Sequence, residues 1–191
     1  MKKMMMIAAM MIAAISANAQ NEVGQITLKP TAGINLANLT DLNENKMRLG
    51  IVAGLEAEYG VAENFGITAG VLYSQQGCKF EWTEEGATQK ATEKHDYINI
   101  PILAQYYVIP GLAIKAGVQP GFLISAKYES ENIKDEIKGF NVSIPVGLSY
   151  EYENFVIDAR YNFGLTKHNK NGNNSCKDSM FSFTLGYKFA L

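Results

Sequence analysis

Apolar residues recur at every second position through most of the chain, which is the period of a β-strand and not of a helix. In the segment 155–166, for example, Phe155 and Ile157 lie on one side of the strand, while Asp158 and Arg160 lie on the other. The same alternation reaches the end of the chain. It predicts strands at eight places: 25–38, 48–59, 65–76, 96–108, 112–127, 139–152, 155–166 and 180–189.

The two sides of these predicted strands differ in chemistry. One side is apolar throughout, and the other mixes glycine, polar and charged residues. A soluble barrel buries its apolar side, whereas a membrane barrel turns that side to the lipid, where a lysine or arginine at mid-membrane costs about 2–4 kcal/mol. All strand-core charges fall on the side that a membrane barrel turns inward: Lys29, Glu56, Glu58, Lys115, Glu151, Asp158, Arg160 and Lys188.

The interior of a barrel of this size is just wide enough to be filled by side chains. We therefore expect the eight inward charges to neutralise one another, as buried charges must. A path for protons or ions through the same network is the functional alternative.

The connections between the predicted strands alternate in length. Long connections cover 39–47, 77–95, 128–138 and 167–179, and short ones cover 60–64, 109–111 and 153–154. Bacterial outer-membrane barrels have even strand numbers, with short periplasmic turns and long extracellular loops. The pattern predicts an all-β fold, an eight-stranded antiparallel up-and-down transmembrane β-barrel, with both ends of the mature chain on the short-turn side.

The first residues have a separate role. Lys2 and Lys3 precede an apolar run and the small-residue sequence Ala17-Asn18-Ala19, which predicts a cleaved signal peptide at 1–19 and Sec-dependent export of a barrel domain at 20–191. The apolar run is too short to span about 30 Å of hydrocarbon. Without Lys2 and Lys3, the chain keeps 15 of its 17 basic residues and all 19 acidic ones. Its net charge is then near −4, which argues against a nucleic-acid partner.

Four prolines fall inside predicted strands: Pro30, Pro101, Pro120 and Pro145. Proline cannot donate a ladder hydrogen bond, so each predicts a bulge, a bend or a strand boundary.

Two of these prolines lie in similar Ile-Pro stretches, "YINIPILAQYY" at 97–107 and "PVGLSYEY" at 145–152, the second preceded by Ile144. Together with the signal sequence, the eight strands and the aromatic final strand, they resemble the PorT-like outer-membrane β-barrel family. The resemblance implies an integral protein of the cell outer membrane, surrounded by outer-membrane lipid and inserted by the barrel-assembly machinery. It implies no particular activity. The family's usual terminal phenylalanine is Phe189 here, followed by Ala190 and Leu191.

The two cysteines, Cys78 and Cys176, both fall in predicted long loops of an exported protein, where a disulfide can persist. However, the third and eighth strands are not neighbours in an up-and-down barrel, and a disulfide needs Cα atoms within about 7 Å. A disulfide and two separate thiols therefore both remain open.

Few residues could support catalysis. The histidines, His95 and His168, fall in predicted loops with four acidic or hydroxyl residues near them in sequence: Asp96, Ser175, Asp178 and Ser179. Their spacing matches no motif, and a catalytic triad is defined by geometry that the sequence does not supply. We predict no enzyme, no catalytic residue, no cofactor and no metal site.

The longest predicted loop, 77–95, carries Phe80 and the single tryptophan, Trp82. The aromatics indicate either a hairpin that extends beyond the membrane or a contact surface for an unknown extracellular or envelope partner.

The expected function is that of a small non-enzymatic outer-membrane protein, structural or presenting loops to a partner. One alternative is a soluble secreted lipocalin-like barrel, with the apolar side inward around a hydrophobic ligand. A barrel enzyme that modifies lipid is the other, and it requires His95 or His168 beside a hydroxyl at the outer rim.

Overall fold

The computed structural model describes residues 23–40, 45–84, 87–129, 131–135, 137–167 and 177–191. The predicted signal peptide lies outside these residues, so it stays a prediction. Among the described residues, no helix is long and apolar enough to cross a membrane.

The described residues form one antiparallel sheet of eleven strands. Their bounds are β1 (Ile26–Leu39), β2 (Asn45–Ala62), β3 (Phe65–Glu84), β4 (Ala87–Asn99), β5 (Ile102–Ile109), β6 (Leu112–Tyr128), β7 (Glu131–Asn132), β8 (Phe140–Tyr152), β9 (Phe155–Lys167), β10 (Lys177–Tyr187) and β11 (Phe189–Ala190).

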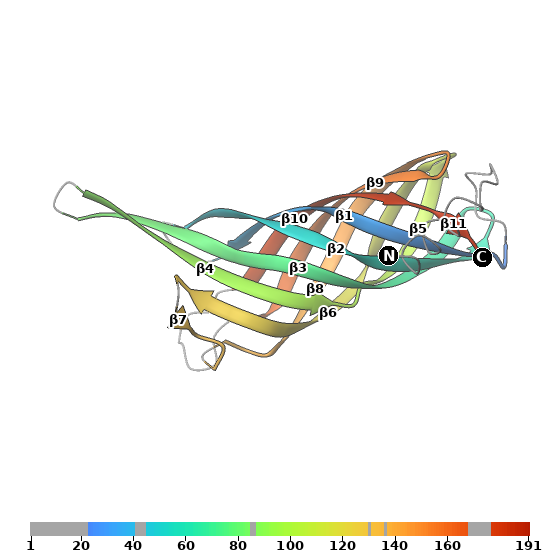
Figure 1. Cartoon of the computed structure of the whole chain (residues 1–191). Coiled ribbons are helices and arrows are strands. Elements are labelled where there is room, and N and C mark those ends of the chain that lie inside the picture. The colour runs from blue at the N-terminus through green and yellow to red at the C-terminus, as the bar shows by residue number, and fades with distance from the viewer. Residues whose placement is uncertain (1–22, 41–44, 85–86, 130, 136, 168–176) are drawn as a thin grey trace, which may run out of the picture.

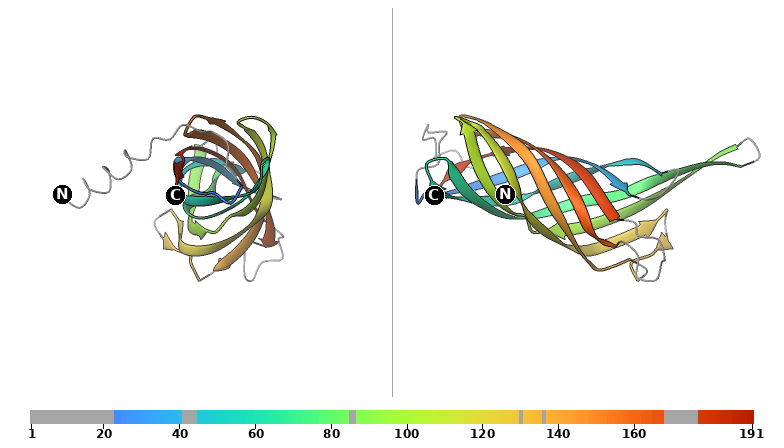
Figure 2. Two further views of the ribbon diagram at one scale, coloured as in Figure 1. Left: turned by 90° about the vertical axis from the view of Figure 1, so that its right-hand side faces the viewer. Right: turned by 180° about the vertical axis from the view of Figure 1, so that it is seen from behind.

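The sheet closes on itself because β10 and β11 both pair with β1 (Figures 1 and 2). The segments β4 and β5 are two halves of one barrel strand, as are β10 and β11, and β7 is a short addition to the outer end of β6. The ring therefore has eight strands within the described residues, as predicted. Closure pairs the strand edges around the ring, so that no row of backbone N–H and C=O groups is left exposed within the barrel wall.

The prolines explain where the strands break. Pro101 separates β4 from β5, and opposite it on β6 the Pro120 carbonyl accepts the Ile100 N–H at 2.8 Å. Pro30 lies opposite the break between β10 and β11, while pairing with Leu55 on its other side. Each break thus falls where proline has no N–H to donate to the ladder.

The apolar side of the barrel faces outward. Each of the following outward side chains is exposed: Ile34, Leu49, Ile51, Leu55, Ile67, Val71, Ile102, Ile114, Val118, Ile124, Val146, Leu148, Ile157, Leu165, Phe183 and Leu185. This arrangement excludes the soluble lipocalin-like alternative, which requires the same side chains to line an internal cavity.

Aromatic side chains gather where the chain turns or ends at the short-turn end. Phe155 and Tyr187 meet edge to face with ring centroids 5.1 Å apart, and Tyr187 lies 4.7 Å from Phe189. The expected continuous last strand is wrong at Lys188, where the backbone N–H bonds instead to the Asn154 carbonyl at 2.7 Å.

The prediction of a loop at 77–95 is also wrong. Those residues belong to β3 and β4, which pair continuously from Leu72–Asn99 to Glu84–Ala87 and form a long hairpin beyond the rest of the barrel (Figure 1). The extended-hairpin alternative was correct.

The predicted loop at 128–138 folds back on the barrel. Ile133 and Ile137 pack against the inward side chains of Tyr97, Leu123 and Ala126, near the long-loop end. This apolar cluster covers part of the inner face of β4 and β6.

Candidate functional site

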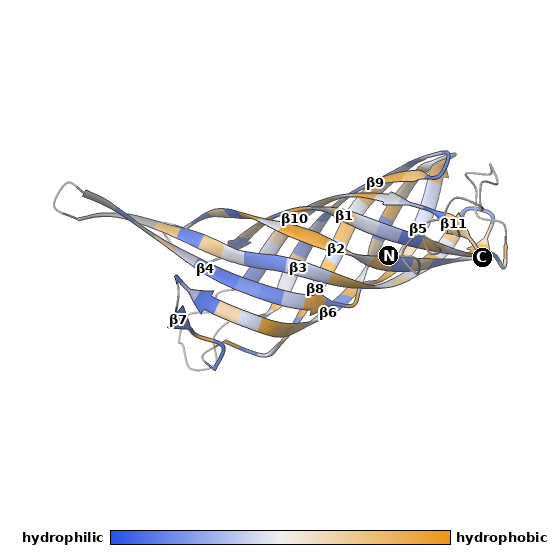
Figure 3. Ribbon diagram, viewed as in Figure 1, coloured by the Kyte–Doolittle hydropathy of each residue, from blue (hydrophilic) through white to orange (hydrophobic). Residues whose placement is uncertain are grey.

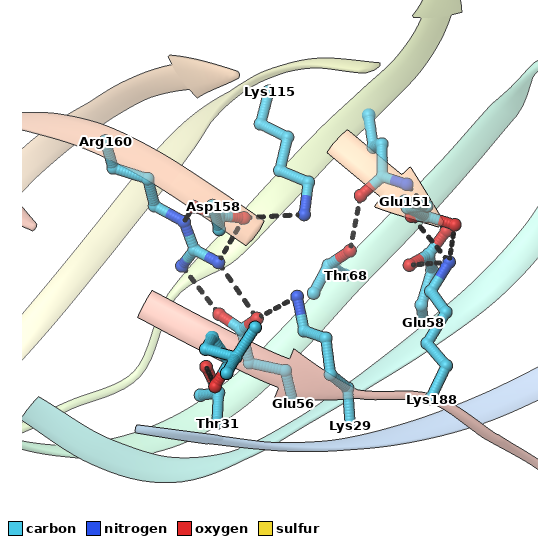
Figure 4. A network of polar contacts seen from close by, with 12 residues as sticks. Lys29, Thr31, Glu56, Glu58, Thr68, Lys115, Glu151, Asp158, Arg160 and Lys188 are labelled. Carbon is cyan, nitrogen blue, oxygen red and sulfur yellow. Dashed lines mark hydrogen bonds and ion pairs between the residues drawn. The ribbon is translucent and has the colours of Figure 1, made fainter. Parts of the chain in front are cut away.

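The barrel interior contains all eight charged residues that the sequence analysis placed inward, and Arg48 and Glu93 are buried on the same side of their strands. None of the eight is more than 7% exposed. They come from six barrel strands, and the structure brings them together in two adjacent groups (Figure 4).

The first group, here called the central cluster, consists of Lys29, Glu56, Lys115, Asp158 and Arg160. The guanidinium of Arg160 donates to both oxygens of Glu56, with Nη1–Oε1 at 2.6 Å and Nη2–Oε2 at 2.9 Å. Its Nε also donates to Asp158 Oδ1 at 2.5 Å. Lys29 Nζ lies 2.7 Å from Glu56 Oε2, and Lys115 Nζ lies 2.8 Å from Asp158 Oδ2.

The second group, here called the terminal cluster, lies next to the C-terminal break in the last strand. Lys188 Nζ donates to both oxygens of Glu151 at 2.8 Å and lies 3.0 Å from Glu58 Oε2. The Tyr107 hydroxyl oxygen is 2.7 Å from Glu151 Oε1 and 2.9 Å from Glu58 Oε1. Gln105 Nε2 donates to Glu58 Oε1 at 2.7 Å and also contacts the Tyr107 hydroxyl.

The two clusters balance each other in charge. The central cluster holds three cationic and two anionic side chains, and the terminal cluster holds two anionic and one cationic. Together the eight groups are neutral. Such balance is what allows charges to lie inside a closed barrel, because an unpaired buried charge costs several kcal/mol.

Glycines on adjacent strands make room for these long side chains. A Cβ at Gly186 would lie 2.8 Å from Lys29 Cγ, and a Cβ at Gly70 would lie 2.7 Å from Glu56 Cγ. A Cβ at Gly147 would similarly meet Arg160 Cγ at 2.9 Å. The inward glycines thus leave the space that the charged side chains opposite them occupy.

The interior leaves little free space. Two cavities of about 10 Å³ each lie among the polar side chains between the central cluster and the long-loop end, and each has room for about one water molecule. The arrangement ties six strands together by charge and hydrogen bonds, in a lumen filled as expected for eight strands.

Sequence reasoning missed Tyr107 and Gln105 as members of the terminal cluster. Both follow the inward alternation of the Ile-Pro strand, as do Leu103 and Asn99. Their inward parity was visible in the sequence, but their contacts with Glu58 cross the barrel interior between β5 and β2, which do not pair in the sheet.

Among the described residues, the predicted catalytic candidates do not assemble at the rim. His95 lies in β4, not in a loop, and its fully buried Nε2 is 2.9 Å from Glu93 Oε1 inside the barrel. Ser179 pairs with Asn38 and Phe163, whereas His168 and Ser175 lie outside the described residues. Among the described residues, no three His, Cys, Asp or Glu side chains form a metal-binding group.

Three of the remaining candidates, Cys78, Phe80 and Trp82, lie on the long hairpin. Cys78 is buried on β3 opposite Glu93, and Cys176 lies outside the described residues, so the disulfide stays a prediction. Phe80 is half-buried, with its ring centroid 6.4 Å from that of Tyr128. Trp82 lies within β3, but its side chain is outside what the structure describes.

Comparison with known proteins agrees with this geometry. Residues 18–169 match the family described as outer membrane protein beta-barrel domain. The chain belongs to this family. It is therefore a small integral protein of the cell outer membrane, and its exposed apolar band faces the lipid. No curated protein matches the chain by sequence.

Solved outer-membrane barrels share the fold at low sequence identity. Ail of Yersinia pestis, solved with the heparin analogue sucrose octasulfate, is 15% identical with a TM-score of 0.54, covering 88% of this chain and 100% of Ail. Neisserial surface protein A is 14% identical with a TM-score of 0.51, covering 91% and 99%. OprG of Pseudomonas aeruginosa is 11% identical with a TM-score of 0.50, covering 91% and 98%.

Proposed function

We propose that this protein is a PorT-like, non-enzymatic outer-membrane barrel that presents its long-loop end to a partner outside the cell or in the envelope. In this proposal the signal peptide at 1–19 directs Sec-dependent export, and the barrel-assembly machinery inserts the mature chain. The short-turn end, which carries both ends of the barrel, faces the periplasm, in line with the usual orientation of bacterial barrels.

The observation that carries the proposal is the paired and filled interior. Every one of the eight lumen charges contacts an opposite charge within 3.0 Å, and the cavities beside them have room for about one water each. A lumen of this kind supports the strands and offers no site for a solute. Contacts with other molecules are then left to the outer surfaces, as is usual for rigid scaffolds.

The long hairpin of β3 and β4 is the surface that we assign to a partner. From Glu81–Lys90 outward its two strands pair only with each other among the described residues, so both outer edges of this ribbon have backbone groups free to bond. The aromatic residues Phe80 and Trp82 lie at its base and on its outer part. The burial of His95 inside the barrel is why we propose no catalysis there.

Electrical recording tests the filled lumen. The purified barrel, refolded into a planar phosphatidylcholine bilayer, is expected to give no single-channel steps at moderate voltage. Stable channel openings in the wild-type protein, absent from a heat-denatured control, would establish a conducting lumen and contradict the structural role proposed for the charges.

Shortening the hairpin tests the presentation role. Replacing 82–89 by Asn-Gly removes most of the outer ribbon and keeps Phe80 and the pairs from Leu72–Asn99 to Glu81–Lys90. We expect an inserted, heat-modifiable barrel that loses the cross-links formed by a photoreactive residue at Phe80 in intact cells. A matched photoreactive residue at Tyr152, at the other end of the barrel, should not share those products. Identical cross-links from both positions would contradict a role for the hairpin.

A further inference from the structure

Four lysines cross the outward face of adjacent strands at the long-loop end. Lys46 on β2 pairs directly with Lys79 on β3, and Lys94 on β4 pairs directly with Lys127 on β6. Lys79 and Lys94 are diagonal neighbours, because Lys79 pairs with Thr92 and is two residues out of register with Lys94. We call these four exposed residues the lysine belt.

The belt places like charges directly opposite one another twice. Side chains paired in this way have Cβ atoms about 4.5–5.5 Å apart, and like charges in such positions are destabilising. Lys79, Lys94 and Lys127 form no ion pair with the described residues. The arrangement is therefore unfavourable by itself and becomes favourable when an anion lies against it.

Two carboxylates border the belt without cancelling it. Glu129 Oε1 accepts the Thr92 backbone N–H at 2.7 Å. Asp96 shares the outward face of β4, two residues from Lys94 on the side nearer the apolar band. Among the described side chains, Lys79, Lys94 and Lys127 outnumber these two carboxylates, which leaves an excess of positive charge on this side of the barrel.

The belt lies just beyond the lipid-facing band. Lys46 lies three residues from Leu49, Lys127 three from Ile124, and Lys94 four from Ile98, each on the side of the long-loop end. A strand rises about 3.3 Å per residue and tilts by roughly 45°, so these lysines stand roughly 7–10 Å above the last apolar side chains. The polar layer of each leaflet is about 5–8 Å thick, so the ammonium groups reach the depth of lipid head groups. Figure 3 shows the same change from apolar to hydrophilic along β3, β4 and β6.

We propose that the lysine belt binds the phosphate groups of an outer-leaflet lipid. Lysine recognises phosphate as a point charge, and several lysines spaced across adjacent strands suit a head group that carries more than one phosphate. The acyl chains of that lipid lie against the apolar band directly below, which is continuous with the belt. The assignment of the belt to the outer leaflet rests on the orientation proposed above.

Enrichment of a phosphorylated lipid around the barrel tests the proposal. The refolded protein is placed in phosphatidylcholine vesicles that contain a small fraction of dansyl-labelled bisphosphorylated lipid A, and energy transfer from Trp82, the single tryptophan, reports lipid near the belt. The test variant carries Lys94→Gln with Lys127→Gln. The matched control carries Lys134→Gln with Lys138→Gln, which removes two lysines from the connection that follows β7.

Each lysine near an anionic lipid contributes roughly fivefold in affinity at low salt. We expect the test variant to lose roughly tenfold to thirtyfold in enrichment, and the control variant to match the wild type. Lys94→Arg with Lys127→Arg should retain the wild-type enrichment, and added salt should weaken it. Equal enrichment of dephosphorylated lipid A would overturn the proposal, because acyl contact alone would explain it. Equal losses in both glutamine variants would do the same, since only net charge would then matter.

Orientation is tested separately, in cells. An epitope inserted between Glu84 and Ala87 should bind antibody on intact cells. Antibody binding only after the outer membrane is permeabilised would overturn the orientation and with it the outer-leaflet assignment, while the vesicle result would still report whether the belt binds phosphate.

Discussion

At the scale of single residues, Arg160 is the junction of the interior. Its guanidinium bridges Glu56, which lies 104 residues away in sequence, and Asp158 on its own strand. Lys29 and Lys115, which lie on two other strands, pair with Glu56 and Asp158 respectively. Removal of one member from such a network leaves the others buried without compensation.

We therefore expect Arg160→Met to lower the free energy of unfolding by about 3–5 kcal/mol, because Glu56 and Asp158 lose the cation that they share. Urea titration of the refolded barrel in lipid vesicles measures this change. Lys138→Met, which removes a cation from the connection before β8, should change the free energy by less than about 0.5 kcal/mol. A similar small effect of Arg160→Met would mean that the central cluster contributes little to stability.

A methyl group at Gly186 provides a second residue-scale prediction. It would meet Lys29 Cγ at 2.8 Å and Cδ at 3.0 Å, on the path by which that side chain reaches Glu56. Gly186→Ala should cost about 1–3 kcal/mol in the same titration, as an overpacked core does. Gly139→Ala is the matched control, since its Cβ meets nothing within 4 Å. Equal stability of the two variants would contradict the role given to the inward glycine.

The sequence was sufficient to place these eight charges inward, because alternation fixes which side of a strand each residue occupies. It also placed Lys29 and Glu56 on strands that adjoin across the first hairpin, but their direct pairing depends on the register that the structure shows. The Arg160–Glu56 contact could not be predicted from the sequence, because two residues that meet across a barrel interior share no register along the sheet.

At the scale of elements, the position of a residue within the outward apolar band determines the cost of a charged side chain there. Val146 is exposed in the middle of β8, while Tyr152 is exposed at its short-turn end. An arginine on the lipid face costs about 2–4 kcal/mol at the bilayer midplane and about 0–1 kcal/mol near the interfaces.

Val146→Arg should accordingly lose about 2–4 kcal/mol of unfolding free energy in lipid vesicles, and Tyr152→Arg about 0–1 kcal/mol from the charge. The comparison is made by urea titration under identical conditions. Equal costs at the two positions would show that depth in the bilayer does not govern them, which contradicts the lipid-facing assignment of β8.

The hairpin of β3 and β4 shows where strand prediction from sequence fails. In β1, in β2 and in β3 up to Gln76, apolar and polar residues alternate strongly, because one side of each strand faces lipid. Beyond that point β3 still alternates, with Cys78, Phe80 and Trp82 at every second position, but residues 87–94 of β4 have no large apolar side chain, so that strand has the same composition as a loop. Pairing of residues 77–84 with 87–94 depends on register with an adjacent strand, and no local pattern records it.

At the scale of the whole molecule, the protein places its apolar and charged side chains in the reverse of a soluble barrel's arrangement. The apolar side chains that a soluble barrel would bury face the lipid, and the charges that it would expose neutralise one another inside. Strand number, the direction of the apolar side and the short turns could all be predicted from alternation and turn spacing. The split strands needed the structure, although the prolines marked two of the break points in advance.

Fractionation of cells tests the central assignment most directly. If the apolar side faces lipid, the mature protein should remain with the outer-membrane fraction after carbonate washing, dissolve only in detergent, and migrate faster on gels before heating than after. Recovery of the protein in the soluble periplasmic or extracellular fraction, with the same mobility before and after heating, would contradict the account.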